Sequence, residues 1–180
     1  MRAALLGSFS HGTALGVVAP ASSGFSELVA SRNDSATRFV PFDADSPGAL
    51  ALESCDNLIV EGLDELAEPV AFLRSLRAAA ASARLFLLVA NAAHASALSA
   101  FFRGERLCGA HPLVKAELEA LLAASGWKML AVNPLPAPST VPAGAFPVHI
   151  ATAGIQFDVA DAAMLERLVP QAFVAIAEAA

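Results

Sequence analysis

Charged side chains are scarce in this chain of 180 residues. They make up 16% of it, against about a quarter in an average globular protein, while hydrophobic residues make up 56%. The formal net charge of −6 argues against a nucleic-acid-binding protein, which needs a basic face, and no cluster of lysine or arginine suggests a membrane surface. So little polar surface predicts exposed apolar patches and therefore a homo-oligomer, most simply a dimer. The alternative is that an alanine-rich composition inflates the apolar count.

Cysteine is also rare, and Cys55 and Cys108 match no metal-binding or redox spacing. The four histidines lie in separate elements without i, i+4 pairing, so no metal site is predicted. No apolar run is long enough to span a membrane. The N-terminal segment lacks the continuous apolar core of a secretory signal, because Ser8, Ser10 and Gly12 interrupt it. We therefore expect a cytoplasmic protein.

Short apolar runs alternate with helical patterns along the chain. The runs predict buried strands at Thr13–Ala19, Arg38–Phe42, Leu58–Val60, Leu85–Val89, Trp127–Val132 and Ala172–Ala177. Helices are predicted at Phe25–Ser31, Pro69–Arg77, Lys115–Ser125 and Asp161–Val169, a Pro-rich loop at 134–147 and an extended arm at Val148–Val159. The alternation predicts one α/β domain over residues 1–180, a three-layer sandwich with helices on both faces of a mostly parallel sheet.

The middle of the chain carries a series of motifs. Asp56 opens the strand at 58–60, an acidic loop follows at 61–66, and the helix Pro69–Arg77 leads into a strand that ends in Asn91-Ala92-Ala93-His94. With Phe101–Gly104, His111 and Gly126-Trp127, these motifs resemble the C-terminal half of class I S-adenosylmethionine-dependent methyltransferases over residues 37–133. The resemblance implies a Rossmann-like sheet whose last strand, here Ala172–Ala177, runs antiparallel beside the fifth.

The glycine-rich loop that this family places after its first strand is missing or degenerate. In one alignment Leu15–Gly24 is that strand and loop, and Pro20, Ser22 and Gly24 occupy the three glycine positions. In the other, Thr13–Val18 is the second strand and the first strand is absent or replaced by Ala3–Phe9. We prefer the second alignment, because the interval from Asp43 to Asp56 then matches the family spacing between strands three and four. The fold is then N-terminally truncated or degenerate.

The resemblance implies candidate site residues. Asp43 falls on an acid that contacts the cofactor in either alignment, and its alternative role is that of a turn residue. Glu61 and Gly62 fall on cofactor contacts, although acids in this loop also favour the N-terminus of the next helix.

Two further candidates follow the strand at 85–89. Asn91 is a candidate substrate contact and His94 a candidate general base, because ligands bind beyond the carboxyl ends of parallel strands. Alternatively, Asn91 holds the loop and His94 caps the next helix. His111 matches a substrate-binding position, but the aromatic pair expected after it is replaced by Pro112-Leu113-Val114.

These observations predict a methyltransferase-like protein with a degenerate S-adenosylmethionine site that is catalytically silent and acts as a binding or oligomeric subunit. The alternative is an active S-adenosylmethionine-dependent methyltransferase that acts on a small molecule. We give equal weight to binding of S-adenosylmethionine and to the absence of any cofactor.

Overall fold

The computed structural model describes residues 1–42, 52–105, 113–135 and 146–180. Along the chain the elements are α1 (Arg2–Gly7), β1 (Leu15–Pro20), α2 (Phe25–Arg32), β2 (Thr37–Phe42), β3 (Asn57–Glu61), the 3₁₀ turn η1 (Leu63–Glu65), α3 (Pro69–Ala79), β4 (Arg84–Ala90), α4 (Ala95–Phe102), α5 (Lys115–Ala124), β5 (Trp127–Leu135), β6 (Val148–Thr152), β7 (Ile155–Val159), α6 (Ala162–Leu168) and β8 (Ala172–Ala179). The strands and helices predicted from the sequence are present, with ends that differ by a few residues. Pro134, predicted in the Pro-rich loop, lies in β5.

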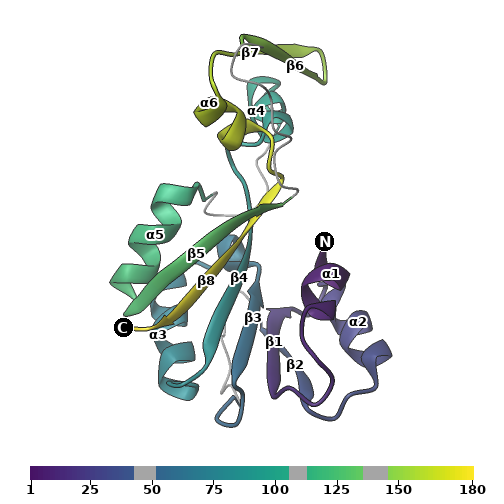
Figure 1. Ribbon diagram of the computed structural model, residues 1–180, viewed down its shortest axis with the longest axis vertical. Helices are drawn as coiled ribbons and strands as arrows, with labels where there is room; N and C mark the ends of the chain where they lie inside the picture. The colour runs from purple at the N-terminus through teal and green to yellow at the C-terminus, as the bar shows by residue number, and fades with distance from the viewer. Residues whose placement is uncertain (43–51, 106–112, 136–145) are drawn as a thin grey trace.

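The described strands form a central sheet in the order β2-β1-β3-β4-β8-β5 (Figure 1). β1 pairs parallel with both β2 and β3, and β3 pairs parallel with β4. β8 runs antiparallel to both β4 and β5. The predicted mostly parallel sheet with an antiparallel last strand beside Arg84–Ala90 is therefore confirmed.

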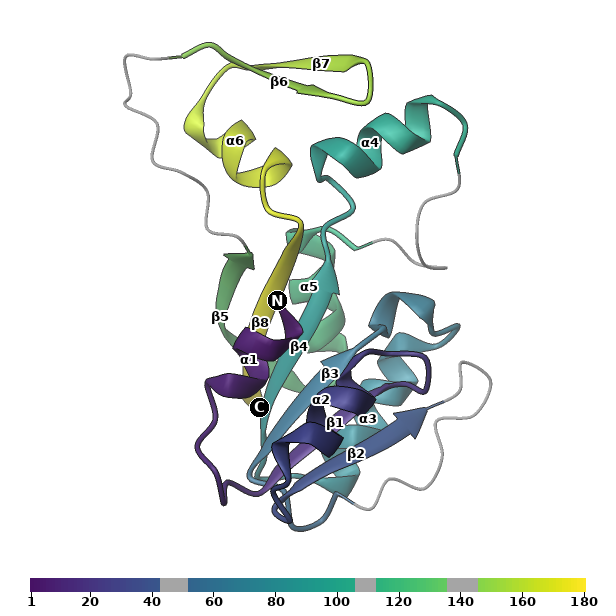
Figure 2. The same ribbon diagram turned by 90° about the vertical axis from the view of Figure 1, so that its right-hand side faces the viewer.

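Helices cover both faces of this sheet, as predicted (Figure 2). Side chains alternate between the faces, so Leu58 and Val60 of β3 pack in the cluster that contains residues of α3 and α5, whereas Ile59 packs in the cluster with Leu6 of α1 and Phe25 of α2. Burial of Leu58, Ile59 and Val60 on both faces explains why β3 reads as a continuous apolar run.

The preferred alignment of the N-terminal strands is wrong. β1 lies between β2 and β3, with Leu15 opposite both Thr37 and Asn57, so it holds the central position that the first strand takes in a doubly wound sheet. The first strand is therefore present, and Ala3–Phe9 does not replace it, since α1 covers most of that segment. β2 is one of the two edge strands of the sheet, and no strand lies beyond it in the described part of the chain.

A small lobe extends beyond the carboxyl end of β4, built from α4, α6 and the strands β6 and β7 (Figures 1 and 2). The predicted extended arm is an antiparallel hairpin in which Val148 pairs with Val159. Val159, Leu165 and Leu168 form the buried centre of the lobe. Asp161 caps α6 by accepting a hydrogen bond from the Met164 backbone N–H at 2.7 Å, as its position predicted. Across the four described ranges, every helix is too short or too polar to cross a bilayer.

Candidate functional site

A cleft of about 400 Å³ lies at the carboxyl ends of β1, β3 and β4. The chain leaves β1 toward one side of the sheet and β3 continues on the other, and open α/β sheets bind ligands at this switch point. Pro20, Ser22 and Ser23 line the cleft from the loop after β1, and Glu61, Gly62 and Asp64 line it from the segment after β3. Two of the predicted cofactor residues, Glu61 and Gly62, are therefore in the cleft.

The loop after β1 closes tightly on itself. The Ser23 backbone N–H donates to the Pro20 carbonyl at 2.8 Å, and the Phe25 N–H donates to the Ser23 hydroxyl at 3.2 Å. Pro20 has no N–H to offer. Pro20 and Ser22 therefore stand where the methyltransferase resemblance calls for glycines, and two of the loop's N–H groups are used within the loop.

Two side chains that line the cleft donate hydrogen bonds to the carboxylate of Glu61. Its two carboxylate oxygens share the single Nε–H of Arg2, at 2.8 and 2.9 Å, and Oε2 also accepts from the Ser23 hydroxyl at 2.5 Å. The Glu61 side chain is 14% exposed and that of Arg2 45%. A methyl group added at Gly24 would lie 3.8 Å from an Nη atom of Arg2, so this guanidinium lies across the gap between the two loops.

Gly62 is required at its position for two reasons. Its φ of +82° lies in the left-handed region, where a Cβ is unfavourable. A Cβ there would also lie 2.7 Å from Pro20 Cγ and 3.3 Å from the Phe42 ring. Pro20 and Gly62 are thus in close contact at the base of the cleft.

Asp64 adds a second carboxyl group to the cleft wall. Burial raises the pKa of Asp64, and the negative charge of Glu61 raises it further. Asp64 lies in the short 3₁₀ turn η1 and not in the first turn of α3, the helix to which the alternative interpretation of these acids referred.

Asn91 and His94 are not among the residues that line this cleft, and both have structural partners. Asn91 is 3% exposed and donates from Nδ2 to the carbonyls of Arg167, at 2.8 Å, and Pro170, at 2.7 Å. Its Oδ1 accepts from the Ala93 N–H at 3.0 Å. Asn91 therefore joins the end of β4 to the end of α6, a link that the sequence did not predict, and its bond to Ala93 lies in the loop that its alternative role concerned. It also lines a second cavity of about 790 Å³ between α5, α6 and β5.

His94 is the N-cap of α4. Its Nδ1 accepts from the Ser96 backbone N–H at 3.3 Å and lies 2.6 Å from the Ser96 hydroxyl. Burial lowers the pKa of His94, which favours the neutral ring that this cap needs. His94 is not among the residues that line the cleft with Glu61. Asp43 and His111 lie outside the described residues.

Sequence reasoning missed Arg2 and Ser23 as partners of Glu61. Ser23 was within reach, because it lies in a loop that follows a buried strand, and Asp64 belongs to the loop at 61–66 in which the resemblance places substrate and cofactor contacts. Arg2 was not within reach, because it is 59 positions from Glu61 and no local pattern connects the two.

Comparison with solved structures identifies the fold. The chain is similar to a SAM-dependent methyltransferase from Archaeoglobus fulgidus, with a TM-score of 0.62 and 13% identity over 98% of this chain and 90% of that one. The fold is that of S-adenosylmethionine-dependent methyltransferases. The methyltransferase resemblance drawn from the sequence is thereby confirmed at the level of the fold.

Two other structures with a similar fold are a longer methyltransferase and a complex of two proteins. The chain is also similar to RosA, the N,N-8-amino-8-demethyl-D-riboflavin dimethyltransferase from Streptomyces davawensis, with a TM-score of 0.55 and 20% identity. The match covers 99% of this chain and 45% of RosA, so this chain spans less than half the length of RosA. A structure of the complex with the Haloferax volcanii Trm112 methyltransferase activator gives a TM-score of 0.58 at 12% identity, over 94% of this chain and 83% of that one. No family model matches the sequence, and no curated protein matches it.

Proposed function

We propose that this chain is a methyltransferase-like binding subunit that no longer uses S-adenosylmethionine. The observation that carries this proposal is the contact between Arg2 and Glu61. The Glu61 carboxylate at the switch point is neutralised by the guanidinium of Arg2 at 2.8 Å. A cofactor entering here has to displace Arg2 from Glu61, and it then still meets the loop after β1, which leaves it no backbone cradle.

The loop after β1 supports the same conclusion. A cofactor cradle needs backbone that approaches the ligand closely and presents N–H groups, which is why glycine suits it. Pro20 offers no N–H, and its ring packs against Gly62 instead of leaving space. Ser23 uses its hydroxyl on Glu61 and its N–H on Pro20. These residues do not fit the methionine part of S-adenosylmethionine.

An active methyltransferase for a small molecule is the second candidate, and the cleft itself favours it. Its volume of about 400 Å³ falls within the range of roughly 300–1,000 Å³ typical of small-molecule sites. In that case Glu61 and Gly62 contact the cofactor, with Asp43 following β2 as a further acid. His94 as catalytic base and Asn91 and His111 as substrate contacts remain predictions from the sequence.

The proposed subunit works with a partner, for which the simplest choice is a second copy. The low content of charged residues and the exposed aromatic pair Phe101 and Phe102, at 57% and 66% exposure, support an apolar contact surface. A similar fold occurs in a complex with the Trm112 activator, so a different protein partner is the alternative. We place this assembly in the cytoplasm, as the sequence predicts.

Isothermal titration calorimetry with S-adenosylmethionine and S-adenosylhomocysteine tests the proposal. The wild-type chain is expected to give no saturable heat at millimolar ligand. Micromolar binding that Glu61→Gln abolishes would establish the second candidate instead. Micromolar binding that survives Glu61→Gln would place a cofactor site elsewhere and overturn both assignments of this cleft.

A further inference from the structure

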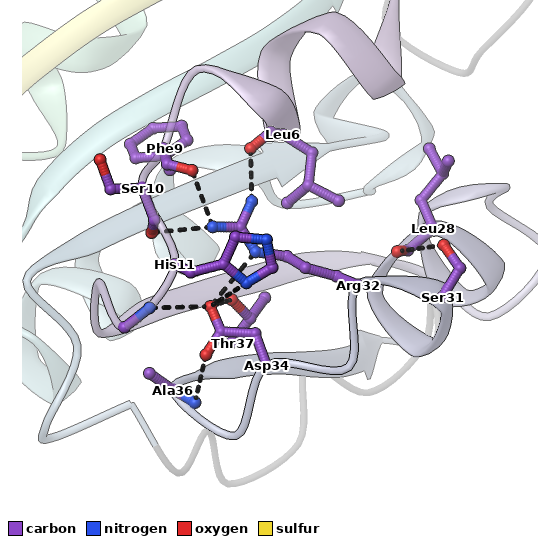
Figure 3. Close-up of polar contacts among 11 residues, drawn as sticks. Leu6, Phe9, Ser10, His11, Leu28, Ser31, Arg32, Asp34, Ala36 and Thr37 are labelled. Atoms are coloured by element: carbon purple, nitrogen blue, oxygen red, sulfur yellow. Dashed lines mark hydrogen bonds and ion pairs between the residues drawn. The ribbon is translucent and has the colours of Figure 1, made fainter.

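Helix α1 is attached to the rest of the chain at both of its ends. At its start, Arg2 pairs with Glu61 beyond β3. At its other end, the guanidinium of Arg32 in α2 donates to the carbonyl of Leu6 in the last turn, at 2.8 Å, and to those of Phe9 and Ser10 beyond it, at 2.7 and 2.8 Å (Figure 3).

The attachment by Arg32 is the stronger of the two. Arg32 also pairs with Asp34 at 3.3 Å, and both side chains are 7% exposed. Asp34 in turn accepts from the backbone N–H groups of Ala36 and Gly12, each at 3.1 Å (Figure 3). This network fixes the end of α1 and the segment after it with several hydrogen bonds made by two side chains that are almost fully buried.

The attachment by Arg2 is the weaker one. The Arg2 side chain is 45% exposed, and ion pairs that water reaches contribute little to stability and weaken with salt. The first turn of α1 therefore depends on one screened contact, while its last turn is held by a network.

That first turn covers the cleft. Met1 and Arg2 form part of the cleft wall, while Leu88 and Ala172, which also line it, are only 3% and 2% exposed. Leu6, in the last turn of α1, packs in the same cluster as Leu88 and Ala172 and belongs to the end held by Arg32. Movement of the first turn, which would take Met1 and Arg2 out of the cleft wall, would therefore widen the cleft above Leu88 and Ala172.

We propose that α1 is a strap over the cleft, with Arg2–Glu61 as its latch and the Arg32 network as its fixed end. When the ion pair opens, the first turn moves away and the floor of the cleft becomes accessible. The strap controls access for any ligand of this cleft, so the inference does not depend on whether the ligand is S-adenosylmethionine.

Thiol labelling measures this opening directly. We replace Cys108 with serine and Ala172 with cysteine, so that the only two thiols are Cys55 and the new one at the cleft floor. Cys55 is buried in the other face of the sheet and reports global unfolding. The labelling rate of each thiol is followed by mass spectrometry of its peptide, with and without Arg2→Gln.

The Arg2→Gln change is expected to speed labelling at position 172 by about two- to fivefold, the range that a partly exposed ion pair contributes, and to leave Cys55 unchanged. Salt is expected to speed the same reaction only when Arg2 is present. Lys128→Gln, which removes the surface pair between Lys128 and Glu178, is the matched control and is expected to have no effect at position 172.

Equal rates with and without Arg2, or equal acceleration of both thiols, would overturn the strap. Leu88→Cys provides a second reporter in the cleft lining if cysteine at position 172 destabilises the chain, and the same outcomes apply. The labelling needs no ligand, so its failure is distinguishable from a failure of the proposed function, which calorimetry tests separately.

Discussion

Replacing Gly62 with alanine is expected to destabilise the protein by about 2–5 kcal/mol. The left-handed φ of +82° costs an alanine roughly 1–2 kcal/mol. The new Cβ would also lie 2.7 and 2.8 Å from two ring carbons of Pro20, and such overpacking costs about 1–3 kcal/mol. A proline ring cannot rotate away as a flexible side chain does, so the backbone after β1 has to shift.

Gly12→Ala is the matched control. Gly12 has the same φ of +82°, but a Cβ there meets nothing within 4 Å. Its backbone N–H, which donates to Asp34, is retained in alanine. The control is therefore expected to lose only the roughly 1–2 kcal/mol of backbone strain.

Urea unfolding of the wild type and both variants measures these free energies. The difference between Gly62→Ala and Gly12→Ala isolates the contact with Pro20. If the two variants were equally stable, Pro20 and Gly62 would not be packed against each other, and the account of the loop after β1 would fail.

Three further predictions concern other parts of the molecule. Backbone hydrogen bonds from Ala36 and Gly12 lower the pKa of Asp34 to about 2, so the ionised carboxylate stabilises the fold fully above its ordinary pKa and loses this effect as the pH falls through about 4 to 2. In acid unfolding curves, Asp34→Asn should therefore lose less stability over this window than the wild type does. Asn91→Leu leaves the carbonyls of Arg167 and Pro170 without the donor that Asn91 supplies, and it is expected to lower the free energy of unfolding by about 2–4 kcal/mol, measured in urea. An unchanged urea midpoint would refute the role of Asn91 in joining β4 to α6. Phe101→Ser with Phe102→Ser is expected to convert a dimer to a monomer in light scattering, and a wild-type monomer would remove the second-copy proposal.

Local patterns were enough to predict most of the elements of this fold. β3 and β4 are short apolar runs buried on both faces, and Pro69, at the first position of α3, marks the helix start. The position of β1 was not predictable in the same way, because the pairing of Leu15 with both Thr37 and Asn57 is a tertiary contact. The spacing from Asp43 to Asp56 favoured the alignment in which Thr13–Val18 is the second strand. That alignment requires a further strand, which the described residues do not contain.

The candidate site was predictable only in part. Glu61 and Gly62 follow a recognisable strand, so their place at its carboxyl end could be inferred. The structural roles of Asn91 and His94 were among the alternatives, since an N-cap and a loop holder are common uses of these side chains. Arg2 lies in a helix far along the chain from Glu61, and only the fold brings the two together.

The central claim is that the cleft at the ends of β1 and β3 no longer receives S-adenosylmethionine. The most direct test is a set of ¹H–¹⁵N spectra of the wild-type chain recorded while S-adenosylhomocysteine is added to millimolar concentration, because these detect weak binding and locate it. The account predicts that the amides of Ser22, Ser23, Gly62 and Asp64 do not move. Saturable shifts of these four amides would contradict it.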